Sequence, residues 1–181
     1  MKVEKIYIKD LLVIEPEVFG DERGYFFESF SNKKYRDNGI DYNFVQDNIS
    51  KSKKGTLRGL HYQIGKNAQG KLCQVINGKV LDVAVDLRIN SPSYGKYFSI
   101  ELSEENHLQL WIPKGFAHGF SVLSDEAVFY YKCTDYYSKP DERAIIFNDP
   151  DLNIDWRIND PTVSEKDKLG KLFKDIDKDF M

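Results

Sequence analysis

The sequence predicts an all-β fold, an antiparallel sandwich or barrel, from three features. Between about Phe44 and Cys133 the chain reads as short apolar runs separated by turn residues, which favours antiparallel strands over βαβ units. Asn77 and Gly78 suit a type I′ turn between two runs rich in Val and Leu, and they predict a hairpin. In residues 80–87 an apolar face alternates with a face that carries two carboxylates, so the second face meets solvent or lines a cavity.

Two short helices are expected at the periphery. In SNKKYRDNG, Ser31 is the expected N-cap of a helix and Asn38-Gly39 its stop. At the C-terminus, SEKDKLGKLFKDIDKDF carries apolar residues at the i, i+3, i+4, i+7 spacing of one helix face, which predicts an amphipathic helix that docks on the sheet. The apolar positions of this stripe are Leu169, Leu172, Phe173 and Ile176.

The whole chain, residues 1–181, has the composition of a single globular domain. Hydrophobic residues make up 41% and the net charge is -3, which excludes disordered and polyelectrolyte proteins. No targeting segment and no apolar run of the roughly 20 residues that span a bilayer is present, so we expect a cytoplasmic protein without a membrane partner. An isoelectric point near 5.7 argues against a nucleic-acid partner. Cys73 and Cys133 lack CxxC spacing, so we expect two buried thiols rather than a disulfide or a zinc site.

His61, in LRGLHYQ, is the first candidate for chemistry. A neutral imidazole is the usual general base near physiological pH, whereas the alternative is a hydrogen-bonded core histidine, which the spacing alone slightly favours. Arg58 lies three residues earlier, so a regular strand would place the two side chains on opposite faces. For both to reach one ligand, a twist, a concave wall or a bulge at Gly59 has to bring them together.

His118, in GFAHGF, is as ambiguous as His61 when taken alone. The two histidines together raise the alternative of a metal site, because β barrels often hold a metal with histidines and a carboxylate. The chain has no HxH pair, and Gln63 stands two positions after His61, so the ligands would have to come from scattered strands. We therefore expect no metal.

Arg58 and Lys71 lie in otherwise apolar or glycine-bounded strands, LRGLH and QGKLCQV. A charge in such a setting is costly unless it has a partner. A bound diphosphate or carboxylate would serve as that partner. An internal acid, Asp82 or Asp86, would serve equally well.

Two further segments each have a structural and a chemical interpretation. Tyr130 and Tyr131 are good strand formers, and the pleat lets only one of them face a cavity. Asp167 follows Ser164 by three residues, close to a capping box in which the acid bonds back to the N-cap amide. From spacing alone, the cap is the favoured interpretation of Asp167.

Seven segments in fixed order resemble the dTDP-4-dehydrorhamnose 3,5-epimerase family: FGDERGYFFESF, FVQDNISKS, LRGLHYQ, QGKLCQVINGKVLDVAVDLR, QLWIPKGFAHGF, YYKCTDYY and SEKD. The resemblance extends from about Phe19 to Asp167. It implies a cupin-type double-stranded β-helix, or jelly roll, that works as a homodimer without a cofactor or metal. The implied substrate is a dTDP-linked 4-keto-6-deoxyhexose, and the implied product feeds L-rhamnose synthesis.

The resemblance also implies a role for each matching residue. It makes His61 the base and Asp167 its partner. It makes Tyr131 the acid and places Lys71 near the sugar ketone. The residues that it implies bind the nucleotide sugar are Arg23, Glu28, Gln46, Asp47, Asn48, Arg58, His118, Glu142 and Lys166.

These roles fit the chemistry of a 4-keto sugar. The ketone acidifies the hydrogens on C3 and C5, because either carbanion delocalises onto the carbonyl oxygen. Epimerisation then needs a base, a cation or donor at that oxygen, and an acid on the opposite face. The cations near His61 would keep its ring neutral and ready to accept a proton. The alternatives are a one-carbon epimerase or ketoisomerase, a noncatalytic sugar-nucleotide-binding cupin, and a metal-dependent cupin oxygenase.

Overall fold

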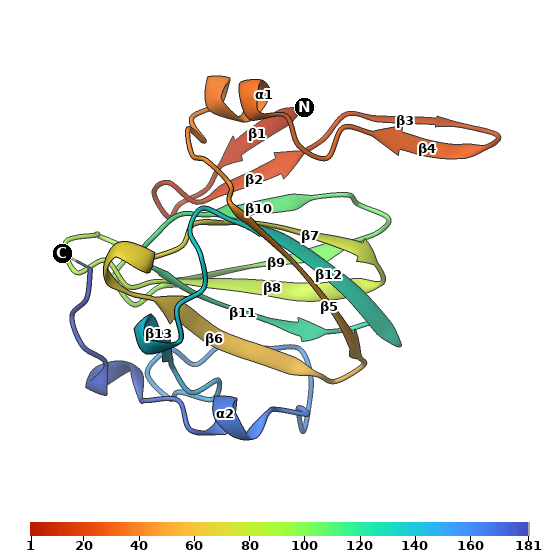
Figure 1. The fold of residues 1–181 in the computed structure, drawn as a ribbon. Helices are drawn as coiled ribbons and strands as arrows, with labels where there is room; N and C mark the ends of the chain where they lie inside the picture. Colours follow the sequence, from red (N-terminus) through yellow and green to blue (C-terminus); the bar gives the residue numbers. More distant parts are fainter. Residues whose placement is uncertain (181) are drawn as a thin grey trace.

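The computed structural model describes residues 1–180 as two antiparallel sheets, with a hairpin that projects from one end (Figure 1). The six-stranded sheet has the order β1 (Lys2–Lys5), β2 (Leu12–Glu15), β10 (Gln109–Ile112), β7 (Lys71–Asn77), β12 (Glu126–Cys133) and β5 (Gln46–Lys53). The five-stranded sheet has the order β13 (Glu142–Ala144), β6 (Leu57–Gln63), β11 (Phe116–Val122), β8 (Lys79–Asp86) and β9 (Tyr97–Ser103). The hairpin consists of β3 (Val18–Asp21) and β4 (Gly24–Phe27). The predicted antiparallel all-β fold is confirmed.

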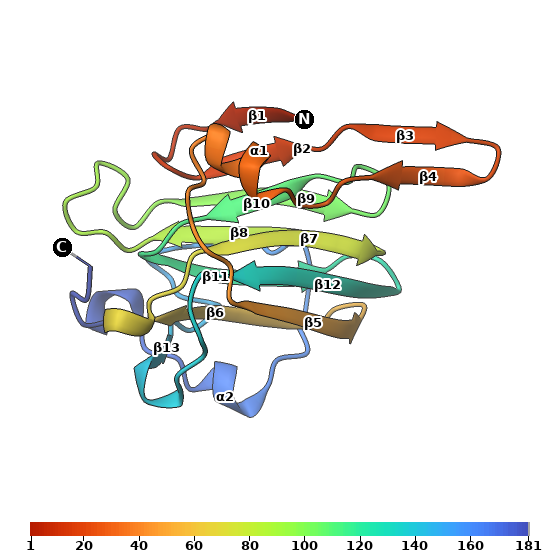
Figure 2. The same cartoon turned by 45° about the horizontal axis from the view of Figure 1, so that its top comes forward.

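From β5 to β12 the chain winds back and forth between the two sheets. Each connection in this stretch crosses from one sheet to the other, except that β8 and β9 are neighbours in the five-stranded sheet. Such winding is typical of a jelly roll. Figure 2 shows β12 between β7 and β5, with the N-terminal strands along the opposite edge of the same sheet. Both sheets therefore contribute strands to one shared interior.

Two apolar clusters hold the sheets in place. The first fills the space between the sheets and includes Phe129 of β12 and Phe120 of β11, whose rings stack with centroids 4.3 Å apart. The second lies on the other face of the five-stranded sheet, where Leu81 and Val83 of β8 pack with Trp156 of the C-terminal segment. The predicted alternation along β8 is thus confirmed, because its two faces belong to different clusters.

The predicted hairpin at Asn77-Gly78 is wrong, although one strand ends and another begins there. β7 pairs with β10 and β12, whereas β8 pairs with β11 and β9, so Gly78 links the two sheets. Gly78 has φ +77°, and a Cβ at this position would overlap the carbonyl oxygen of Glu126. Glycine fits this crossing because it has no Cβ. The strand that follows is buried on both faces, which suits the middle of a covered sheet better than a hairpin arm.

A helix is present in the C-terminal region, but it is a single turn, α2 (Glu165–Lys168), and the predicted long apolar stripe does not form. Lys171 instead makes a parallel bridge with Ile145. Gly170, between α2 and Lys171, approaches the backbone of Ile145 so closely that a Cβ would lie 2.6 Å from the carbonyl carbon of Ile145. Leu169, which the stripe would have buried, is 84% exposed. Glycine is unfavourable in the interior of a helix. After Gly170 the chain pairs with residue 145 instead of continuing the helix.

The helices of this fold are short. Helix α1 (Asn32–Asp37) lies where the sequence predicts it, with Ser31 at its N-cap and Asn38 at its C-cap. Gly39 follows with φ +91°, a conformation that ends a helix. No helix within residues 1–180 is both long enough and apolar enough to cross a membrane.

Candidate active site

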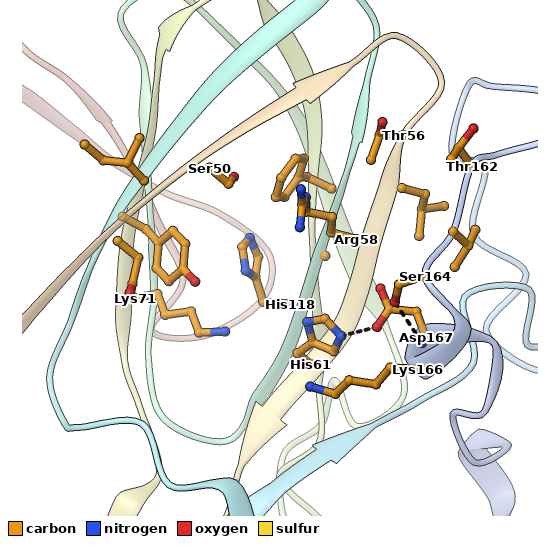
Figure 3. A pocket seen from close by; sticks show the side chains of 17 residues that line it. Ser50, Thr56, Arg58, His61, Lys71, His118, Thr162, Ser164, Lys166 and Asp167 are labelled. Atoms are coloured by element: carbon orange, nitrogen blue, oxygen red, sulfur yellow. Dashed lines mark hydrogen bonds and ion pairs between the residues drawn. The ribbon is translucent and has the colours of Figure 1, made fainter.

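A cavity of about 600 Å³ collects most of the predicted site residues (Figure 3). Its walls come from β5, β6, β7, β11 and β12, together with residues 162–167 of the C-terminal segment. The predicted residues that line it are Asn48, Arg58, His61, Lys71, His118, Tyr131, Lys166 and Asp167. Residues more than 100 positions apart in the sequence thus meet in one space.

His61 of β6 forms a short hydrogen bond with Asp167 of α2. Its Nε2 lies 2.6 Å from Asp167 Oδ1, and the His61 side chain is 30% exposed whereas that of Asp167 is 4% exposed. An ionised carboxylate can only accept, so the Nε2 proton is the one donated. In the neutral ring the second nitrogen, Nδ1, is then the one with the lone pair, and Figure 3 shows it on the side of the ring that faces the cavity. This is the arrangement of an oriented general base.

Asp167 is held in place by the turn that carries it. The Ser164 side chain caps α2 by accepting a hydrogen bond of 3.1 Å from the Asp167 amide. The carboxylate does not complete a capping box; its Oδ2 accepts from the Gly59 amide at 3.3 Å. Burial alone would raise the pKa of the Asp167 carboxyl group, but the hydrogen bonds from His61 and Gly59 lower it below its usual value. Ser164 is thus the helix N-cap, as predicted, whereas the Asp167 carboxylate binds His61 and not the N-cap amide.

A bulge in β6 brings Arg58 and His61 to the same face. In the pairing with β11, His61 is opposite His118 and Arg58 is opposite Phe120, so two residues of β6 face the single residue between them. Gly59 has φ +127°, and a Cβ there would lie 2.5 Å from the Cα of the facing residue of β11. Of the three alternatives considered, a twist, a concave wall and a bulge at Gly59, the structure has the bulge. A side chain at this position would push the two strands apart.

Arg58 and Lys71 bring positive charge to the cavity without an acidic partner. Within residues 1–180 neither forms an ion pair; Arg58 Nε donates to Ser52 Oγ at 3.0 Å. The two acids considered as internal partners are occupied elsewhere, because Asp82 contacts a histidine and Asp86 contacts Arg88. Two uncompensated cations in a cavity create a binding site for an anion.

Tyr131 of β12 faces the cavity, and Tyr130 points to the other side of the sheet. The hydroxyl of Tyr130 donates to Asp47 at 3.0 Å. Lys71 Nζ lies 5.9 Å from the centroid of the Tyr131 ring. Burial raises the pKa of the Tyr131 hydroxyl above its usual value, so it is a protonated donor at neutral pH. The expectation that only one tyrosine of the pair faces inward is confirmed.

His118 forms a second, more deeply buried histidine–carboxylate pair. Its Nε2 lies 2.6 Å from Oδ1 of Asp82, which is fully buried. Burial and, to a smaller extent, Lys71 lower the pKa of His118 below its usual value although the neighbouring Asp82 raises it, so the ring is held neutral. With Nε2 occupied, Nδ1 is the nitrogen that remains free to accept a hydrogen bond.

The remaining predicted residues of β5 are divided between the cavity and the opposite side of the sheet. Asn48 lines the cavity and accepts a hydrogen bond from the Gln46 side chain at 3.1 Å. Asp47 points away and pairs with Lys132 at 2.8 Å. Gln46 also accepts from the Tyr137 amide at 2.9 Å, which ties the loop after β12 to the edge of the site.

Glu142 and Lys166 form an ion pair at the rim. Lys166 Nζ lies 2.5 Å from Glu142 Oε1, and Tyr137 donates its hydroxyl to Oε2 of the same carboxylate at 3.0 Å. Burial would raise the pKa of Glu142, but these two contacts lower it below its usual value. Lys166 lines the cavity, whereas Glu142 lies behind it.

Two predicted residues lie outside the cavity. Arg23 is at the tip of the β3–β4 hairpin, where it pairs with Asp21 and is 85% exposed. Glu28 follows β4 and pairs with Lys34 at 2.9 Å. Neither residue lines the cavity of its own chain.

Sequence reasoning did not identify the contacts of several residues that lie behind the cavity wall. Cys73 and Asp82 contact His118 from β7 and β8, and Ser52 holds the guanidinium of Arg58. For Asp82 a signal was available, because the alternation along β8 placed it on the face opposite the apolar one. For Cys73 none existed, because its neighbour lies 45 residues away in the sequence.

Comparisons with known proteins show the family of this chain. The family model described as dTDP-4-dehydrorhamnose 3,5-epimerase matches residues 5–175. The dTDP-4-dehydrorhamnose 3,5-epimerase of Shigella flexneri is 54% identical over 178 residues, with 98% of each chain covered. A crystal structure of the Elizabethkingia anophelis enzyme of the same name is 54% identical, with a TM-score of 0.92 and 97% of each chain covered.

A second solved structure is informative about ligands. It is a dTDP-6-deoxy-D-glucose-3,5-epimerase from Legionella pneumophila in complex with dTDP-4-keto-L-rhamnose, 52% identical with a TM-score of 0.94. The match covers 97% of the present chain and 94% of the other. The family model spans the jelly roll, the bulged strand and the C-terminal turn alike. This chain therefore belongs to the dTDP-4-dehydrorhamnose 3,5-epimerase family.

Proposed function

We propose that this protein converts dTDP-4-keto-6-deoxy-D-glucose to dTDP-4-keto-L-rhamnose, the 3,5-epimerisation step of dTDP-L-rhamnose biosynthesis. One observation carries the proposal: an oriented base and a buried acid line one cavity from opposite sheets. His61 lies on β6 of the five-stranded sheet, and Tyr131 lies on β12 of the six-stranded sheet. Inversion at carbon requires proton removal on one face and proton return on the other, which this arrangement supplies.

The first chemical step is proton transfer from C3 or C5 to Nδ1 of His61. The ring becomes an imidazolium, and Asp167, 2.6 Å from Nε2, stabilises that charge. The electron pair left on carbon delocalises onto the C4 oxygen as an enolate. Lys71 is the cation that we assign to this oxygen, because it lines the cavity without an ion-pair partner.

The second step returns a proton to the other face of the flat enolate. Tyr131 is the donor that we assign, since burial raises the pKa of its hydroxyl and keeps it protonated. Arg58, fixed by Ser52, binds the diphosphate of the nucleotide. Binding the remote nucleotide orients the sugar between base and acid, which a free sugar would lack. Gln46, Asn48, His118 and Lys166 are the further residues that we assign to substrate contacts.

Deuterium exchange tests this function directly. The protein is incubated with dTDP-4-keto-6-deoxy-D-glucose in deuterated water, and the ring carbons are followed by NMR. We expect deuterium at both C3 and C5 and a product of L-rhamno configuration. The control is His61→Ala, which should bind dTDP and catalyse no exchange. Deuterium at one carbon only would establish a one-carbon epimerase. Binding of the nucleotide sugar without deuterium exchange at either carbon would establish a noncatalytic binding protein.

We also propose that the protein forms a homodimer through the β3–β4 hairpin. The hairpin projects from the sandwich (Figure 1) and exposes Phe19, Tyr25 and Phe26 by 58%, 58% and 70%. Large apolar side chains grouped on one projecting element are typical of an interaction surface. Arg23 and Glu28 would then complete the cavity of the second copy, which accounts for their distance from their own.

Subunit mixing tests this arrangement. Arg23→Ala and His61→Ala variants are each expected to have little activity as homodimers. A mixed dimer would hold one intact cavity, with His61 from one chain and Arg23 from the other. Random exchange should therefore restore about a quarter of wild-type activity. A mixture that stays as inactive as its parents would show that Arg23 does not act across a dimer.

We infer that residues 1–181 form one epimerase domain, because both sheets and the C-terminal turn contribute to a single cavity. We also assign the protein to the cytoplasm, where buried free thiols such as Cys73 and Cys133 are usual.

A further inference from the structure

Behind the cavity wall, three potential metal ligands meet in the interior of the sandwich. They are Cys73 of β7, Asp82 of β8 and His118 of β11, and one ligand atom of each lies within 4.8 Å of the other two. Cys73 and Asp82 are fully buried and His118 is 6% exposed. The proposed epimerisation uses neither the thiol nor the Asp82 carboxylate.

The spacing of the sulfur and nitrogen atoms is close to that of a metal site. Cys73 Sγ lies 3.8 Å from His118 Nε2. In a tetrahedral zinc site, metal–sulfur and metal–nitrogen bonds of about 2.3 and 2.0 Å place the sulfur and nitrogen atoms roughly 3.5 Å apart. A thiolate, an imidazole and a carboxylate are also ligands that zinc commonly takes.

Asp82 provides a second, independent indication. Its Oδ1 contacts His118, but its Oδ2 is buried and has no hydrogen-bond partner within residues 1–180. Buried carboxylate oxygens are almost always satisfied, because an unpaired one is costly. A cation beside His118 would give this oxygen a partner.

We propose that Cys73, Asp82 and His118 form a binding site for one thiophilic divalent cation, such as Zn²⁺, and that its occupation inhibits the enzyme. The inhibitory part rests on the proposed epimerase function, whereas the binding part does not. His118 lines the cavity directly opposite His61 in the pairing of β11 with β6. An ion on its ring therefore adds charge and changes hydrogen bonding at the wall of the substrate site.

Binding of the cation moves one proton from the cysteine and one on the histidine. The metal takes the sulfur of Cys73 as a thiolate, so the thiol proton leaves to solvent. It takes the lone pair of His118 Nε2, so the proton that Nε2 shared with Asp82 moves to Nδ1. The metal, one thiolate and one carboxylate sum to zero charge, which suits a buried position. His118 then presents an N–H donor to the cavity in place of an acceptor.

Cobalt is the probe for binding, because Co²⁺ takes zinc sites and a thiolate ligand gives it a charge-transfer absorption in the near ultraviolet. The metal-free wild-type chain is titrated with Co²⁺, and bound cobalt is displaced with Zn²⁺. We expect the charge-transfer band, saturation at one ion per chain, and loss of the band on displacement. Binding without that band, or no binding, overturns the proposal without any variant being needed.

The two cysteines offer a matched pair of variants. Cys133 is also buried and free, and it lies on β12 next to β7. We expect Cys73→Ser to lose the cobalt band and to weaken zinc binding at least about tenfold, since a direct ligand matters no less than an outer-shell partner. Cys133→Ser should keep both. Equal loss in the two variants would overturn the assignment to Cys73.

Inhibition is measured with the same proteins. Zn²⁺ should inhibit epimerisation by the wild type and by Cys133→Ser, while Cys73→Ser stays active at zinc concentrations at least about tenfold higher. Zinc that binds without inhibiting would overturn the inhibitory part. A cobalt band in a protein that epimerises neither carbon would instead refute the proposed function and leave the metal site standing.

Discussion

Replacing Asp167 by Asn tests the base assignment most sharply. Asn keeps the size of the side chain but removes the charge that lies 2.6 Å from His61 Nε2. The free energy that the hydrogen bond to the ring contributes falls from the roughly 1.5–3 kcal/mol typical of a bond to a charged group to about 0.5–1.5 kcal/mol, which is typical of a neutral one. In addition, an amide N–H directed at Nε2 places the ring proton on Nδ1, the nitrogen that must accept the substrate proton.

Both effects act on the step in which the base takes a proton. General-base catalysis contributes about 10²–10⁴-fold, so we expect kcat to fall by about that factor, or roughly 2.7–5.5 kcal/mol in activation free energy. One base serves both carbons, so exchange at C3 and C5 should fall together. Exchange is followed by NMR in deuterated water, while calorimetry measures dTDP affinity, which should change little.

The control is Asp175→Asn, an exposed acid on the same C-terminal segment, which should leave exchange unchanged. An Asp167→Asn variant that folds, binds dTDP and retains exchange within about threefold of wild type at both carbons would refute the orientation argument. A fall at one carbon alone would require a second base.

Three other changes are expected to act in different ways. The family resemblance implies that this acid acts on the C5 side of the sugar, so Tyr131→Phe should slow protonation at C5 more than exchange at C3 in the same NMR assay, and equal loss at both carbons would contradict that assignment. Arg58→Gln should weaken dTDP binding at least about tenfold by calorimetry, whereas Lys51→Gln, outside the cavity, should not. Burial would raise the pKa of the Asp86 carboxyl group, but hydrogen bonds from neighbouring groups lower that pKa in the folded protein below the usual 3.8. The ionised carboxylate therefore stabilises the folded state above pH 3.8. This stabilisation is lost as the pH falls through the lowered pKa of the folded state. Asp86→Asn should therefore lower the free energy of unfolding at pH 7 by roughly 1.5–3 kcal/mol, measured by denaturation, and the difference in stability from wild type should narrow towards pH 3. Asp125→Asn on the surface should change the stability little. A stability difference between Asp86→Asn and wild type that does not depend on pH would contradict this.

The parts of the fold that the sequence predicted correctly are those governed by local pattern. The alternation along β8 and the inward position of only one tyrosine of the pair at 130 and 131 depend on side-chain periodicity, and the ends of α1 depend on capping residues; both signals are visible in the sequence. The bulge at Gly59 was one of three alternatives that the sequence left open, beside a twist and a concave wall. Two residues three positions apart had to reach one ligand, and a glycine stood between them.

The parts that failed depend on which strands become neighbours. Gly78 reads as a hairpin turn, yet it leads from one sheet to the other, because pairing partners are chosen over the whole sandwich. The C-terminal apolar spacing reads as a helix, yet Lys171 pairs with Ile145 instead. In the same way, the contact between Cys73 and His118 depends on two strands that the sequence does not show to be close. Long-range pairing is the information that local pattern lacks.

The position of Asp167 has a consequence for regulation of activity by local unfolding. The segment of residues 145–180 packs on the outer face of the five-stranded sheet, and few of its backbone groups belong to either sheet. Such a segment is expected to open at a lower free energy than the strands beneath it. When it opens, His61 loses its carboxylate while Arg58 and Lys71 stay in place on their strands. The enzyme would then still hold its nucleotide but no longer turn it over, so heat inactivation should precede the loss of dTDP binding.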